Sequence, residues 1–115
     1  MAATVVTKVV CNKVNVPVSA ADGFTALNAT DGCSIAYDKP DHRVLLMFKG
    51  SAGTATIQQG DALQGVKNLE VAVTADSISF VVVESGAFLN TTGALRGAVL
   101  VKGPAGISVC AVAIP

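Results

Sequence analysis

Apolar and polar residues alternate in short stretches along the chain, and a period of two predicts β-strands. The clearest stretch is 69–73, where every second residue is Leu or Val. Comparable stretches predict strands over residues 4–10, 14–18, 33–37, 43–49, 54–59, 77–84, 97–102 and 107–114. Turns with glycine or proline separate many of them, at spacings of about 8–12 residues. The pattern predicts one all-β domain over residues 1–115, an antiparallel β-sandwich or small barrel of about eight to ten short strands.

Residues 23–30 leave two interpretations open. Phe24 and Leu27 are three residues apart, which is the spacing of neighbours on one face of a helical turn. Thr25 and Asn28 favour an irregular or extended segment instead, because β-branched residues suit strands and asparagine suits turns.

Three of the predicted strands carry apolar residues on both faces, over residues 44–48, 80–83 and 109–114. Such a strand needs cover on both faces, whereas the core of one sandwich covers only one. The composition agrees, because 51% of residues are hydrophobic and 14% are charged, against about 25% charged in a typical domain. We therefore expect a homo-oligomer, although loops over the outside of a closed barrel would also hide these faces.

The charge balance and the N-terminus narrow the class of protein. Eight Lys and Arg residues offset eight Asp and Glu residues, so the basic excess that nucleic-acid binding requires is missing. No apolar run approaches the ~18 residues of a membrane span. Lys8 follows the first apolar stretch, which does not fit a signal peptide. We expect a protein made in the cytoplasm, with no nucleic-acid or membrane partner, whose three cysteines are buried thiols.

Residues that carry chemistry are few and scattered. Asp38, Asp41 and His42 form the one tight polar group, and an Asp-Pro-Asp turn of this kind is typical of backbone capping. Glu70 and Glu84 fall in different predicted strands, and the stacking aromatics of a sugar site are scarce, at 4% of residues with no tryptophan. We expect no catalytic residue, no metal site and no cofactor, and hence no enzyme.

Three stretches resemble small proteins encoded beside capsid genes in tailed bacteriophages and prophages. They are Thr54–Val73 (TATIQQGDALQGVKNLEVAV), Glu84–Asn90 (ESGAFLN) and Gly97–Gly103 (GAVLVKG), and the resemblance covers roughly residues 43–115. It implies a head decoration (cement) protein, a structural component of the virion made in the bacterial host. The partners it implies are further copies of the chain, as a trimer, and the major capsid protein on the outside of an expanded shell.

Two parts of the chain are candidates for contact with such a shell. The first is an N-terminal interaction arm, residues 1–8, which would add a strand to a neighbouring capsid subunit. The second is the loop 85–96, where apolar residues lie among glycines. The candidate partner-binding residues are Thr4, Val5, Val6, Phe88, Leu89 and Leu95. Phe88 equally fits a role as a plug on the core.

Other functions remain compatible with the same pattern. A tail-tube, head-completion or fibre-associated module of a phage would also be a rigid, non-catalytic β-protein that assembles with other chains. A small bacterial ligand-binding β-barrel is a third possibility, but it should offer interior aromatic residues and polar anchors for its ligand, and the chain has only five aromatic residues, four Phe and one Tyr.

Overall fold

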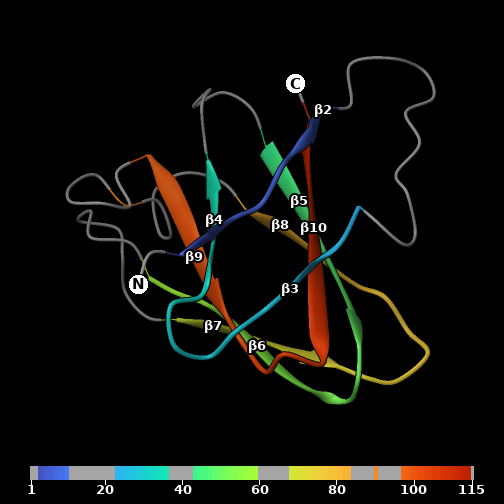
Figure 1. Ribbon diagram of the computed structural model, residues 1–115. Coiled ribbons are helices and arrows are strands. Elements are labelled where there is room, and N and C mark those ends of the chain that lie inside the picture. Colours follow the sequence, from blue (N-terminus) through green and yellow to red (C-terminus); the bar gives the residue numbers. More distant parts are fainter. Residues whose placement is uncertain are drawn as a thin grey trace.

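Ten strands form within the part of the chain that the computed structural model describes, which is residues 3–10, 23–36, 43–59, 68–83, 90 and 97–114. They make two five-stranded sheets, here called sheets A and B, which enclose a common core (Figure 1). The prediction of an all-β sandwich is confirmed. In the described ranges no helix is long and apolar enough to cross a membrane.

The two sheets differ in the order of their strands. Sheet A contains, from edge to edge, β1 (Thr4–Val5), β4 (Cys33–Ala36), β9 (Ala98–Lys102), β6 (Gly53–Ile57) and β7 (Leu69–Val73). Sheet B contains, in the same way, β2 (Val9–Val10), β10 (Ile107–Ile114), β5 (Arg43–Gly50) and β8 (Ser79–Val83). The short strand β3 (Thr25–Ala26) pairs with β10 as well, so residues 23–30 include an extended segment.

The N-terminal segment departs from the single strand expected over residues 4–10. Its first part, β1, pairs with β4 of sheet A, and its second part, β2, pairs with β10 of sheet B. Both pairings are parallel, so the sheets are mixed, whereas the other pairings are antiparallel. The segment crosses between the sheets because Val6, which is 3% exposed, enters the core between β1 and β2.

The sandwich core forms from the inward-facing residues of both sheets. In β5, Val44, Leu46 and Phe48 are buried while the residues between them are half-buried. The same alternation places Val99 and Val101 of β9 opposite them in the core cluster. The core is therefore a layer of aliphatic side chains around one phenylalanine, as a period of two on each strand requires.

A tight connection joins the two sheets at the edge formed by β7 and β8. Asp76 adopts a positive φ of 64°, and the Ser77 amide donates a hydrogen bond to the Thr74 carbonyl at 3.3 Å. The Ser79 hydroxyl donates to the Ala72 carbonyl at 3.1 Å, which ties β8 to β7. β7 and β8 follow one another in the chain and thus lie at the edges of different sheets.

Candidate functional site

The outward side of sheet B is the most distinctive surface of the described residues. Because Val44, Leu46 and Phe48 of β5 point into the core, Leu45 and Met47 point to the opposite side of the sheet. The strand is central in sheet B, between β10 and β8. Residues 44–48 were expected to need cover on both faces; the core covers the inner face, and the outer face remains to be explained.

Cross-strand pairing extends this outer side over three strands. Residues directly opposite each other on neighbouring strands share a face, and each row takes one residue from β10, one from β5 and one from β8. The rows are Val112, Leu45 and Val82 on one level and Cys110, Met47 and Phe80 on the next. These six residues define the outer B face, of which Phe80 and Val82 are exposed, Leu45, Met47 and Val112 are half-buried, and Cys110 is fully buried.

The β8 side of the outer B face is open to solvent. Phe80 is 62% exposed and Val82 is 54% exposed, whereas Val81 packs against the core and Val83 is buried. A phenylalanine and a valine side by side on an exposed strand are unfavourable in water, since burying either would gain about 1.5–3 kcal/mol. Exposed apolar patches of this kind mark contact sites for another molecule.

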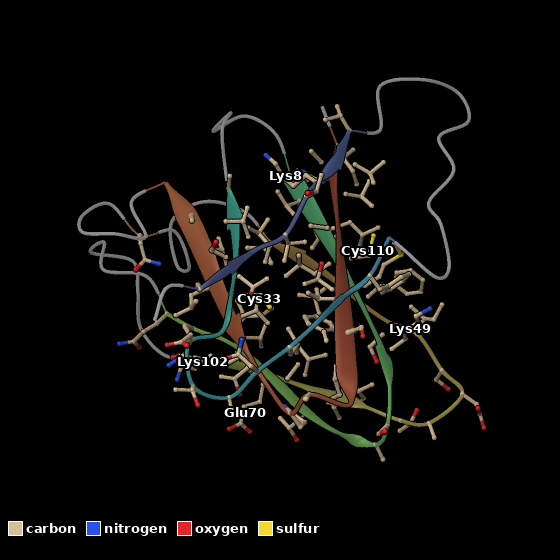
Figure 2. The ribbon with its side chains drawn as sticks, viewed as in Figure 1. Lys8, Cys33, Lys49, Glu70, Lys102 and Cys110 are labelled. Atoms are coloured by element: carbon tan, nitrogen blue, oxygen red, sulfur yellow. The ribbon has the colours of Figure 1, made fainter. Side chains whose placement is uncertain are left out.

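The outward side of sheet A is polar at the end formed by β9, β6 and β7. Lys102, Thr56 and Glu70 lie opposite one another across β9, β6 and β7, and Figure 2 shows Lys102 and Glu70 on that part of the molecule. Thr54 and Ala72, the next pair along, are both exposed. This end of sheet A therefore presents charged and hydroxyl groups to water, whereas sheet B presents Phe80 and Val82.

Two positive side chains flank the outer B face along β5. Lys49 lies beyond Met47, and its ammonium nitrogen is 4.2 Å from the centroid of the Phe24 ring, which is a cation–π contact. Arg43 lies at the other end of β5, opposite Ile114, and is exposed. The six residues of the face between these ends carry no formal charge.

The two described cysteines, both labelled in Figure 2, are buried thiols on different strands, Cys33 on β4 and Cys110 on β10. Cys33 belongs to the core and its thiol donates to the Ala26 carbonyl at 3.4 Å. Cys110 lies on the outer B face, covered by its neighbours. Burial raises the pKa of both thiols, against a smaller lowering by the Asn28 backbone for Cys33 and by the Lys49 charge for Cys110. Both are held in the protonated form, which is a poor nucleophile.

Candidate chemistry from the sequence is placed only in part. Within the described ranges no three His, Cys, Asp or Glu side chains gather as a metal site requires. Asp38, Asp41, His42 and Glu84 lie outside those ranges, and Glu70 is exposed on β7. Among the described residues, the candidate functional site is therefore an apolar surface and not a cluster of reactive groups.

The predicted partner-binding residues fall into three groups. Thr4 and Val5 are exposed, and Val5 at 72% is the most exposed large hydrophobic side chain among the described residues. Val6 is a core residue, so its side chain is unavailable to a partner. The segment does not project as an arm over these residues, because the Thr4 amide donates to the Gly32 carbonyl at 3.1 Å and the Val6 amide to the Ser34 carbonyl at 2.9 Å.

The rest of that prediction falls on other parts of the chain. Phe88, Leu89 and Leu95 lie outside the described residues, so their role in binding a partner stays a prediction. The outer B face was not among the predicted site residues. The signal for it in the sequence was that both odd and even positions are apolar over residues 44–48, 80–83 and 109–114. This pattern indicates a second apolar face but does not show which residues form it.

Comparison of the chain with protein-family models, with curated proteins and with solved structures gave no match. The fold class therefore rests on the strands and their pairing alone. Function has to be argued from the surfaces just described and from the resemblance in the sequence.

Proposed function

We propose that this protein is a structural assembly subunit without catalytic activity, a head decoration protein of a tailed bacteriophage. The observation that carries the proposal is the outer B face, an uncharged apolar surface whose β8 side, with Phe80 and Val82, is exposed to solvent. A protein that works by assembling with other chains needs such a surface, and it needs no reactive cluster. The resemblance to small phage proteins supplies the kind of assembly.

The filled core of the sandwich favours a function carried by the protein surface and argues against an internal ligand site. Side chains from both sheets fill the space between them in the described part of the chain, including Phe48, Leu46 and Ile57, which are fully or almost fully buried. The large apolar groups left over, Phe80 and Val82, lie outside. This arrangement favours an assembly subunit over a ligand-binding barrel, whose apolar groups would line an interior.

In this proposal the protein forms a homo-oligomer in the host cytoplasm and binds the major capsid protein on an expanded head. The outer B face serves the contact between copies. The shell contact uses the edge of sheet A at β1, where Thr4 and Val5 are exposed. An extended capsid segment could lie beside β1, since the bonded amides of Thr4 and Val6 point to β4 and the amide between them points to the other side.

The test is capture by expanded, DNA-free phage heads built from the capsid protein encoded beside this chain. We expect the protein to co-sediment with the heads and the Val5→Lys variant to bind about tenfold or more weakly, because a charge would enter the contact. Ala72→Lys, at the opposite edge of sheet A, is the matched control. Absence of a capsid gene beside this one, or of any binding to the heads, would contradict the decoration role.

A further inference from the structure

We infer that two copies of this chain join edge to edge at β8, so that sheet B continues from one copy into the next through an antiparallel, two-fold symmetric pair of β8 strands. The inference rests on the proposed assembly role and deepens it, because it names the partner and the strand. β8 is the last strand of sheet B, with β5 on one side. In the described ranges no strand pairs with its other side. A free edge of this kind can pair with the edge of another sheet.

The other edge strands of the described chain are protected against such pairing, whereas β8 is not. The strands β1, β2 and β3 are two residues long, and very short edges offer few backbone groups. β7 has five residues but carries the exposed charge of Glu70. β8 also has five residues, Ser79–Val83, and contains no charge, proline or glycine. Because natural sheets block free edges with such devices, their absence from β8 indicates an edge that is paired in the working state.

The backbone groups of Phe80 and Val82 point to the open side of β8. The Leu27 amide donates a hydrogen bond to the Ile107 carbonyl at 2.9 Å, so the backbone of Ile107 points away from β5. Successive residues of an antiparallel strand bond to opposite sides, and the registers of β10 with β5 and of β5 with β8 carry this alternation across the sheet. Val81 therefore bonds to β5, while Phe80 and Val82 on either side of it present their amides and carbonyls to a further strand.

A two-fold axis at the middle of β8 sets the register of the pair. With Val81 opposite Val81 of the second copy, all five residues of both strands overlap and Phe80 lies opposite Val82. Phe80 and Val82 then form hydrogen-bonded pairs, each of which exchanges both of its N–H···O bonds. An aromatic residue opposite a β-branched one is a stabilising cross-strand pair. The strand is thus complementary to itself, as an isologous interface requires.

Charge and exposure favour a like partner for β8. Phe80 is 62% exposed and Val82 is 54% exposed in one chain, and each loses water on the side that meets the other copy. Neither strand carries a charge, so two copies meet without repulsion, whereas an acidic peptide or a nucleic acid would find no complementary group there. The contact does not involve β10, where Cys110 is covered within the chain. An edge contact of this length is small, so we expect a dissociation constant on the order of 10 μM.

The first test removes a backbone donor from the open edge and keeps the side chain apolar. Val82→Pro lacks the outward amide and places its ring at the edge, and an edge strand tolerates proline where the neighbouring strand does not use the amide. We expect the dissociation constant of the pair, measured by sedimentation, to rise about 10-fold or more. Equal association of Val82→Pro and the parent protein would overturn the inference.

Glu70→Pro is the matched control, on the edge strand β7 of sheet A. The Gln58 amide donates to the Leu100 carbonyl at 2.8 Å, and the same alternation through β6 directs the Glu70 amide to the open side of β7. This variant should associate like the parent protein. If it weakens association as much as Val82→Pro does, the contact does not depend on β8 and the inference is overturned.

The second test measures the register and does not depend on the proline variants being folded. Phe80→Cys and Val82→Cys, each combined with Cys11→Ser, place a thiol at an exposed position of β8. Residues in a hydrogen-bonded pair lie about 5.5 Å apart at Cα, which a disulfide can span. Under mild oxidation an equimolar mixture of the two variants should give more cross-linked pair than either variant alone. A mixture that gives no more than the single variants would overturn the inference.

The inference and the proposed function can fail separately. A trimer that survives Val82→Pro and still binds phage heads would overturn the β8 pair and leave the decoration role standing. A pair that is lost in the same variant, from a protein that binds no heads, would support the β8 pair and contradict the decoration role. A protein that stays monomeric and loses thermal stability in Val82→Pro would show that another segment of the same chain covers the edge, which overturns the inference.

Discussion

Gly50 ends β5 with a φ of 131°, a conformation that side-chain-bearing residues rarely adopt. A Cβ placed there would overlap the carbonyl oxygen of Gly106, which also accepts a hydrogen bond from the Ser51 amide at 3.0 Å. Gly50→Ala should therefore lower the free energy of unfolding by about 2 kcal/mol or more, measured by urea denaturation. Gly97→Ala is the matched control, with a φ of 77° but open space around the Cβ, and should lose about 1 kcal/mol. Equal losses would show that the contact with Gly106 has no effect.

The buried thiols of Cys33 and Cys110 make stability depend on pH in the alkaline range. Their pKa values are raised in the folded protein by burial, so the folded state holds protons that the unfolded state has released. Their contribution is full below the ordinary thiol pKa of about 8.5 and is lost as the pH rises through the higher folded value. The free energy of unfolding should thus fall as the pH rises above about 8.5. A Cys33→Ala/Cys110→Ala variant should lose most of this slope, and an unchanged slope would assign it to other groups.

At the scale of the element, the N-terminal segment holds the two sheets together. β1 and β2 are two residues each, too short to be stable alone, and Val6 between them is buried while Val5 is exposed. Val6→Ala should cost about 2 kcal/mol of unfolding free energy through the cavity it leaves, and Val5→Ala less than about 0.5 kcal/mol. Thermal and urea denaturation measure both. Equal effects of the two neighbouring substitutions would contradict the placement of Val6 in the core.

The same segment shows where prediction from the sequence ends. A period of two identified most strands, because alternation reflects which side chains are buried, and β5, β7, β8 and β10 appear close to their expected ranges. It could not divide residues 4–10 between two sheets, since Val5, Val6, Val9 and Val10 are all equally apolar. Parallel pairing with β4 and β10 depends on contacts distant in the sequence, which no local pattern contains.

The sequence pattern predicts that a second apolar face exists, but it does not predict which residues form that face. Residues 80–83 are apolar at both parities, and the pattern alone cannot say which parity faces the core. In the structure the larger Phe80 is outside and Val81 and Val83 are inside. The pairing with Leu45 and Met47 of β5 settles the direction, because opposite residues share a face. The location of an interface thus depended on the register between strands.

At the scale of the whole molecule, the two outward sides of the sandwich have different roles in this account. Sheet A presents Lys102, Glu70 and hydroxyl groups to solvent, and sheet B presents Phe80 and Val82. Association through sheet B should be driven by burial of apolar surface, so raising the ionic strength should weaken it little. Sedimentation at low and high salt checks this. A loss of association at high salt would instead indicate that charge pairs hold the copies together.

The most direct test of the central claim, that this protein works by assembling through the outer B face, is the mass of the unmodified protein in solution. Sedimentation equilibrium from about 1 to 100 μM covers the affinity expected for such an interface. The account predicts a mass that rises with concentration to at least twice the 11.5 kDa of one chain. A mass of 11.5 kDa at every concentration would contradict it.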